Sequence, residues 1–180
     1  MKLLKTLALA SLAFGLTVSA GQASTALGTL THNYGIGQYD PSGNDVLGNG
    51  YVTISDNSSD RFSDAFDFSG VSGTVSALEL TLTFSSAGPN CFLGSCKFGE
   101  DWRVRIQGSN TGSSSDDLMP RLYDELSPQT FVLTSLVDVG AVDVWANAIA
   151  TSTLSFWFAE ESLWADAFDL DSASLRIIGT

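Results

Sequence analysis

A repeated tetrapeptide is the most specific feature of the sequence. Asp-Ala-Phe-Asp occupies 64–67 and again 166–169, and an apolar residue follows each copy. Carboxylate oxygens suit Ca²⁺, which accepts oxygen ligands in a flexible geometry. If the two segments pair, their carboxylates gather at one place, and the sequence then predicts a structural calcium site. Its candidate ligands are Asp64, Asp67, Asp166, Asp169 and Asp171.

The repeat also has a simpler interpretation, in which no metal takes part. Asp beside Phe is common in acidic β-proteins, and a match of four residues also arises by chance. Side chains alternate across a strand, so inward-facing Phe66 and Phe168 would leave Asp67 and Asp169 facing solvent. Asp64 shares the inward parity of Phe66, and we therefore expect it near the end or rim of its strand.

Aromatic residues and two arginines point to sugar recognition. Aromatic faces stack on sugar rings, and guanidinium groups bind carboxylates through paired hydrogen bonds. Arg103 and Arg105 lie on one side of an alternating segment, in a chain with only 8 Lys and Arg. The candidate ligand-binding residues are Trp145, Trp157, Trp164, Arg103 and Arg105, and the predicted partner is a polysaccharide or cell-surface glycan. In the alternative interpretation the rings close the core and the arginines pair with carboxylates on neighbouring strands.

Residues for catalysis are scarce. The chain has one histidine, His32, and no G-x-S-x-G motif, so a Ser-His-Asp triad has no signature. A carboxylate pair for glycoside hydrolysis is the remaining enzymatic alternative, and it depends on a separation that the sequence does not give. We therefore expect a protein that binds rather than catalyses.

Alternating apolar and polar residues predict the elements that position these side chains. The last apolar segment changes parity part-way, which predicts a bulge near 171–174. Helix is expected only as a short turn at 120–126 and at 143–150, where Asp143 would cap the N-terminus. The pattern favours an all-β fold, an antiparallel two-sheet β-sandwich that is jelly-roll-like, in a single domain over 24–180. The expected strands are 27–34, 50–55, 62–68, 78–84, 102–107, 130–136, 153–158 and 168–178.

The first 23 residues have the organisation of a secretory signal peptide. Lys2 and Lys5 precede a short apolar run, and small residues follow it. The run is shorter than the roughly 20 residues of a membrane span, so no span is expected after signal removal. The sequence predicts a secreted or extracellular protein, with the periplasm as an alternative. In an oxidising compartment Cys91 and Cys96 would close a disulfide, whereas a metal site would lack ligands.

The charge balance limits the class of partner. The 8 basic and 20 acidic residues give a net charge of −12, and removing the two signal lysines leaves 6 against 20, or −14. Nucleic acids and anionic membrane surfaces require a basic footprint, so neither is expected as a partner.

The C-terminal segments carry a resemblance to known proteins. The runs at 156–161 and 166–175 resemble the last two strands of secreted bacterial jelly rolls, including carbohydrate-binding modules. The chain after the signal also resembles exported proteins with a PEP-CTERM-type sorting tail, although it ends without a Pro-Glu-Pro motif. The resemblance implies a released envelope or matrix protein that binds glycans. The alternative is a structural matrix or surface protein that self-associates.

Overall fold

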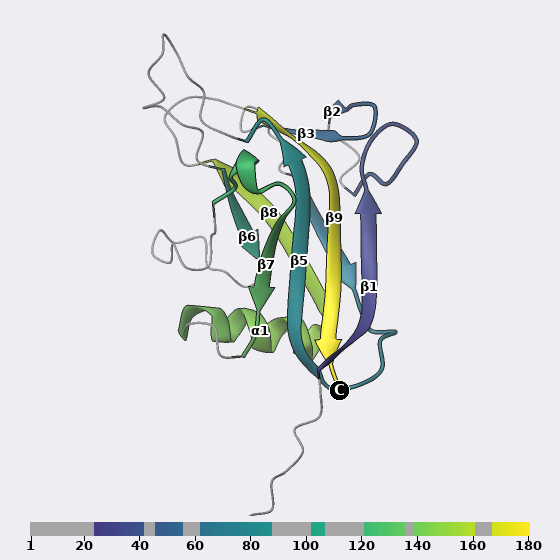
Figure 1. Cartoon of the computed structure of the whole chain (residues 1–180), viewed down its shortest axis with the longest axis vertical. Coiled ribbons are helices and arrows are strands. Elements are labelled where there is room, and N and C mark those ends of the chain that lie inside the picture. Colours follow the sequence, from purple (N-terminus) through teal and green to yellow (C-terminus); the bar gives the residue numbers. More distant parts are fainter. Residues whose placement is uncertain are drawn as a thin grey trace, which may run out of the picture.

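Two antiparallel β-sheets pack face to face in the computed structural model (Figure 1). The structure describes residues 24–41, 46–55, 62–87, 102–106, 121–135, 139–160 and 167–180. The larger sheet has the order β2-β3-β9-β5-β7, with β1 also paired to β9, and the smaller sheet has the order β4-β8-β6. The larger sheet contains β1 (Thr25–Asn33), β2 (Val46–Leu47), β3 (Val52–Ser55), β5 (Val75–Ser85), β7 (Gln129–Leu133) and β9 (Ala167–Gly179). The smaller sheet contains β4 (Ser63–Asp67), β6 (Trp102–Ile106) and β8 (Thr153–Glu160).

The core lies between the sheets and follows from the alternation of apolar residues. In β5 every second side chain, from Leu78 to Phe84, is buried. Phe156 and Phe158 of β8 and Trp102 of β6 meet this layer from the smaller sheet. Burial of these side chains is the main driving force for pairing the two sheets. The predicted all-β, antiparallel two-sheet architecture is therefore confirmed, whereas the jelly-roll order of connections stays a prediction.

Strand β9 contains the bulge that its sequence predicts. Leu170 pairs with Phe84 of β5 and Ser172 pairs with Thr83, so Asp171 is the extra residue. Phe168 and Leu170 are buried before the bulge, and Ala173 and Leu175 are buried after it. The bulge also marks a change of partner, because β3 pairs with β9 before Asp171 and β1 pairs with β9 after it.

Two helical segments accompany the sheets. Helix α1 (Val139–Thr151) lies at one end of the sandwich, and its buried Val144 and Ala148 are one turn apart (Figure 1). It begins before the expected Asp143, which is therefore inside the helix and does not cap it. The predicted turn at 120–126 contains the 3₁₀ helix η2 (Asp124–Leu126). Neither helix, among the residues that the structure describes, has the length and apolar character of a membrane span.

Candidate functional site

The outer face of the smaller sheet brings together three of the residues expected to bind a ligand. Arg105 of β6 pairs directly with Trp157 of β8, and Arg103 pairs with Ala159 two positions along. The inward neighbours Trp102, Val104 and Phe158 are buried in the core. Alternation across the strands therefore places Arg103, Arg105 and Trp157 on the same outward face.

A third arginine, which was not singled out from the sequence, joins this face from the segment of the predicted turn at 120–126. Arg121 forms an isolated antiparallel bridge with Arg103, and its guanidinium carbon lies 5.4 Å from the centroid of the Tyr123 ring. Gln129 of β7 fixes the segment, since its side chain accepts from Tyr123 N–H and donates to the carbonyl of Arg121. We call Arg103, Arg105, Arg121, Tyr123 and Trp157 the Trp157–arginine surface.

The charge of this surface contrasts with that of the whole chain. It holds three of the four basic residues in the described ranges, the fourth being Arg176 on the larger sheet. Its arginines are half-buried, and each has a further interaction within the chain, so none extends into solvent without a partner. Tyr123 is 40% exposed. The surface thus combines positioned guanidinium groups with two aromatic side chains.

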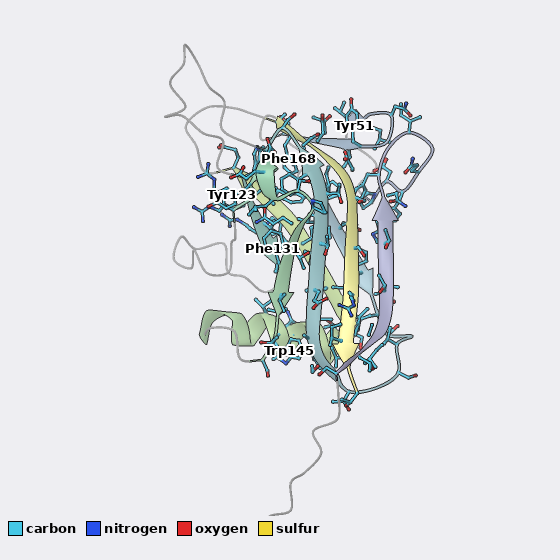
Figure 2. The ribbon with its side chains drawn as sticks, in the orientation of Figure 1. Tyr51, Tyr123, Phe131, Trp145 and Phe168 are labelled. Atoms are coloured by element: carbon cyan, nitrogen blue, oxygen red, sulfur yellow. The ribbon has the colours of Figure 1, made fainter. Side chains whose placement is uncertain are left out.

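The other predicted tryptophans are not part of this surface. Trp145 lies on α1, half-buried and packed against the core. Figure 2 shows Trp145 beside the helix at one end of the molecule and Tyr123 well away from it, toward the other end. Trp164 lies outside the described residues, as do Cys91, Cys96 and the predicted signal peptide at 1–23.

The two Asp-Ala-Phe-Asp segments, which were expected to gather carboxylates by pairing, do not pair. The first lies in β4 and pairs with β8, whereas residues 167–169 of the second open β9 and pair with β3 in the opposite sheet. With Phe66 and Phe168 in the core, Asp67 and Asp169 face outward from different sheets. The premise on which the shared calcium site depended is therefore wrong.

The carboxylates of this set have separate local roles. Asp67 accepts a hydrogen bond from Ser69 N–H, and bonding to Ser69 holds its pKa below the usual value. Asp169 accepts from the Thr53 hydroxyl, while partial burial and the nearby charge of Asp169 raise the pKa of Asp171. Asp166 lies outside the described residues, among which no group of three or more His, Cys, Asp and Glu side chains is arranged to hold a metal ion. Calcium binding stays a prediction.

Asp64 is the centre of a second polar cluster, at the edge where β1 faces β4. Its buried carboxylate accepts from the Tyr34 hydroxyl at 2.6 Å, the Tyr39 hydroxyl at 2.9 Å and its neighbour's N–H, that of Ala65, at 2.7 Å. His32 Nδ1 lies 2.7 Å from the same carboxylate. A buried charge is costly unless hydrogen bonds replace its hydration, and here both oxygens are satisfied. We call His32, Tyr34, Tyr39 and Asp64 the Asp64 cluster.

The aromatic rings of the Asp64 cluster stack from the surface inward. Tyr39, 40% exposed, lies on His32 at a centroid distance of 4.0 Å, and His32 lies on Phe66 at 4.4 Å. Burial and the hydrogen bond to Asp64 raise the pKa of Tyr39 to about 12. Burial and the Asp64 charge raise the pKa of the fully buried Tyr34 well above the ordinary phenol range. Both phenols therefore remain hydrogen-bond donors at neutral pH.

Backbone contacts hold the loop that presents Tyr39. Tyr39 N–H donates to the carbonyl of Asn33, and Ile36 N–H donates to the carbonyl of Gly48 in the adjoining turn. At Gly35, φ is +127° and a Cβ atom would lie 2.7 Å from the backbone nitrogen of Gly50. Only glycine fits this close approach of two turns.

Part of the Asp64 cluster could be predicted from the sequence. An Asp with the inward parity of Phe66 needs hydrogen-bond donors, and its rim position was expected. Its partners were not foreseen, because His32 comes from the opposite sheet, Tyr34 directly follows the end of β1, and Tyr39 comes from a loop. Comparison of the chain with protein-family models, curated proteins and solved structures found no match.

Proposed function

We propose that this is an exported, non-catalytic glycan-binding protein that recognises acidic polysaccharides through the Trp157–arginine surface. The observation that carries the proposal is the register of β6 and β8, which sets Arg105 directly beside Trp157 and Arg103 on the same face. Aromatic side chains provide area for the sugar ring, and guanidinium groups bind the carboxylate of a uronic acid.

The grouping of arginines on one face is notable because the chain as a whole is strongly acidic. With 20 acidic and 8 basic residues, the chain repels anions over most of its surface. The bridge to Arg121 adds a third positive charge beside Arg103. An acidic polymer therefore meets attraction at one face, while a neutral polymer would make no use of the arginines.

Binding of the mature protein to alginate, a uronic acid polymer, tests the proposal against neutral dextran. Replacing both Arg103 and Arg105 by Gln should weaken alginate binding at least tenfold, because charge-assisted hydrogen bonds contribute about 1.5–3 kcal/mol each. Trp157→Ala should weaken it several-fold through lost stacking. Binding should also fall as salt is raised.

The matched control is Arg176→Gln. Arg176 lies on the other sheet, where it pairs with Glu79 at 3.0 Å, and its replacement removes one positive charge from a different face, against two in the double variant. Equal losses in this variant and in the double variant, measured on proteins with native circular dichroism, would contradict the proposal. A protein that ignores every acidic polymer but assembles with rising concentration in light scattering would instead support the structural matrix role.

A further inference from the structure

We propose that Tyr39 and His32 form a second sugar subsite, which takes a neutral sugar ring. In this subsite the ring stacks on Tyr39, and one sugar hydroxyl donates a hydrogen bond to His32 Nε2. The inference extends the proposed glycan-binding function to the Asp64 cluster, which is built from different elements than the Trp157–arginine surface.

The Asp64 carboxylate determines which ring nitrogen of His32 carries the hydrogen. Asp64 Oδ2 already accepts from the Tyr34 hydroxyl, and Oδ1 accepts from the Tyr39 hydroxyl and Ala65 N–H, so the carboxylate acts as an acceptor. An ionised carboxylate only accepts, so the nitrogen facing it, Nδ1, carries the hydrogen. In the neutral ring this leaves Nε2 with its lone pair. The His32 side chain is 22% exposed, which gives a ligand access to the ring.

Contacts within the Asp64 cluster hold the Tyr39 side chain in place. Its hydroxyl is held by Asp64, and its ring rests on His32, which is supported by Phe66 and, behind it, Phe156. A side chain that is ordered before binding loses little conformational entropy when a ligand arrives. Tyr39 is 40% exposed and is supported by these rings, so it is suited to stack on the apolar face of a sugar.

The chemistry of the subsite favours a neutral ligand. The carboxylate beside His32 is buried and negative, and no arginine belongs to the Asp64 cluster. Stacking and a single neutral hydrogen bond give weak affinity, which is typical of one subsite along a longer chain. Its binding should therefore be nearly independent of salt, unlike that of the Trp157–arginine surface.

Nitrogen-15 NMR of the mature, untagged protein tests the proposal. His32 is the only histidine, so its ring signals need no assignment. We expect the Nδ1–H tautomer in the neutral ring, and a shift of the Nε2 signal on addition of at least one of cellohexaose, laminarihexaose and maltohexaose. An Nε2–H tautomer, or no shift with all three sugars, would overturn the proposal.

Two histidine replacements separate binding from folding. His32→Asn keeps an amide N–H near the position of Nδ1, facing Asp64, but lacks Nε2. We expect it to fold and to bind the responding hexasaccharide roughly three- to tenfold more weakly, the loss of one hydrogen bond. Tyr39→Ala should lose binding more fully, whereas Val132→Ala, at a 53% exposed residue of β7 that belongs to neither proposed site, should leave it unchanged. If His32→Asn and Tyr39→Ala, both folded, bind as the native protein does, the subsite is excluded, whatever the result with alginate.

Discussion

Tyr39 connects the exposed loop to the buried carboxylate, and its titration reports on that connection. Its pKa is raised from 10.0 to about 12 in the folded protein, first by burial and then by the bond to Asp64. A raised pKa stabilises the fold fully below the unfolded value and loses its effect as pH rises through the folded value. The free energy of unfolding should therefore decline between about pH 10 and pH 12.

Two variants isolate this contribution. In Tyr39→Phe, which lacks the phenol, the decline in the free energy of unfolding should be shallower. Asp64→Asn removes the carboxylate charge and should lower the pKa of Tyr39, so phenolate absorbance would appear at lower pH. Alkaline spectrophotometric titration, with Tyr123→Phe as the control for an exposed phenol, measures both effects. An unchanged titration curve in Asp64→Asn would show that burial alone determines the shift.

At the scale of single strands, the bulge in β9 predicts that deleting its extra residue is tolerated, whereas deleting a regularly paired residue is not. Asp171 is extra to the pairing with β5, so its deletion leaves Leu175 and Ile177 facing the core. Deletion of Thr81 from β5 instead moves Leu82 and Phe84 to the solvent face, because one residue reverses strand parity. We expect the protein without Asp171 to fold, with reduced stability from the lost carbonyl partner of Tyr34 N–H.

Thermal unfolding followed by circular dichroism compares the two deletions. The protein without Thr81 should show no cooperative transition, since two buried side chains lose their place in the core. A cooperative transition in that variant, or its absence in the protein without Asp171, would contradict the observed register.

The elements were more predictable than the sites because alternation is local. Residues 78–84 carry a period of two that only a half-buried strand explains, and even the β9 bulge follows from a change in parity. The short β2 has too few residues to show a period, and it was missed. Arg121 and the contact of Tyr39 with Asp64 were missed for a different reason: they depend on a bridge and on paired turns that join segments distant in the sequence.

At the scale of the whole molecule, the net negative charge repels the polyanions that the positive charge of the Trp157–arginine surface attracts. The chain carries −12 and has an isoelectric point near 4.1, so an approaching polyanion is repelled by most of the protein. Lowering the pH from 7 to 5 protonates some carboxylates, and Asp171, whose pKa is raised by burial, should be among the first. The arginines keep their charge throughout.

Affinity for a polyanion should therefore rise as the pH falls from 7 to 5 at constant ionic strength. Dextran sulfate is the suitable probe, because its sulfate groups stay ionised over this range while uronic acids begin to protonate. Isothermal titration calorimetry of the native protein should show the increase, and the protein with Gln at both 103 and 105 should show much less of it. An equal increase in that variant would mean that reduced repulsion alone drives binding, and the Trp157–arginine surface would then have no specific part in it.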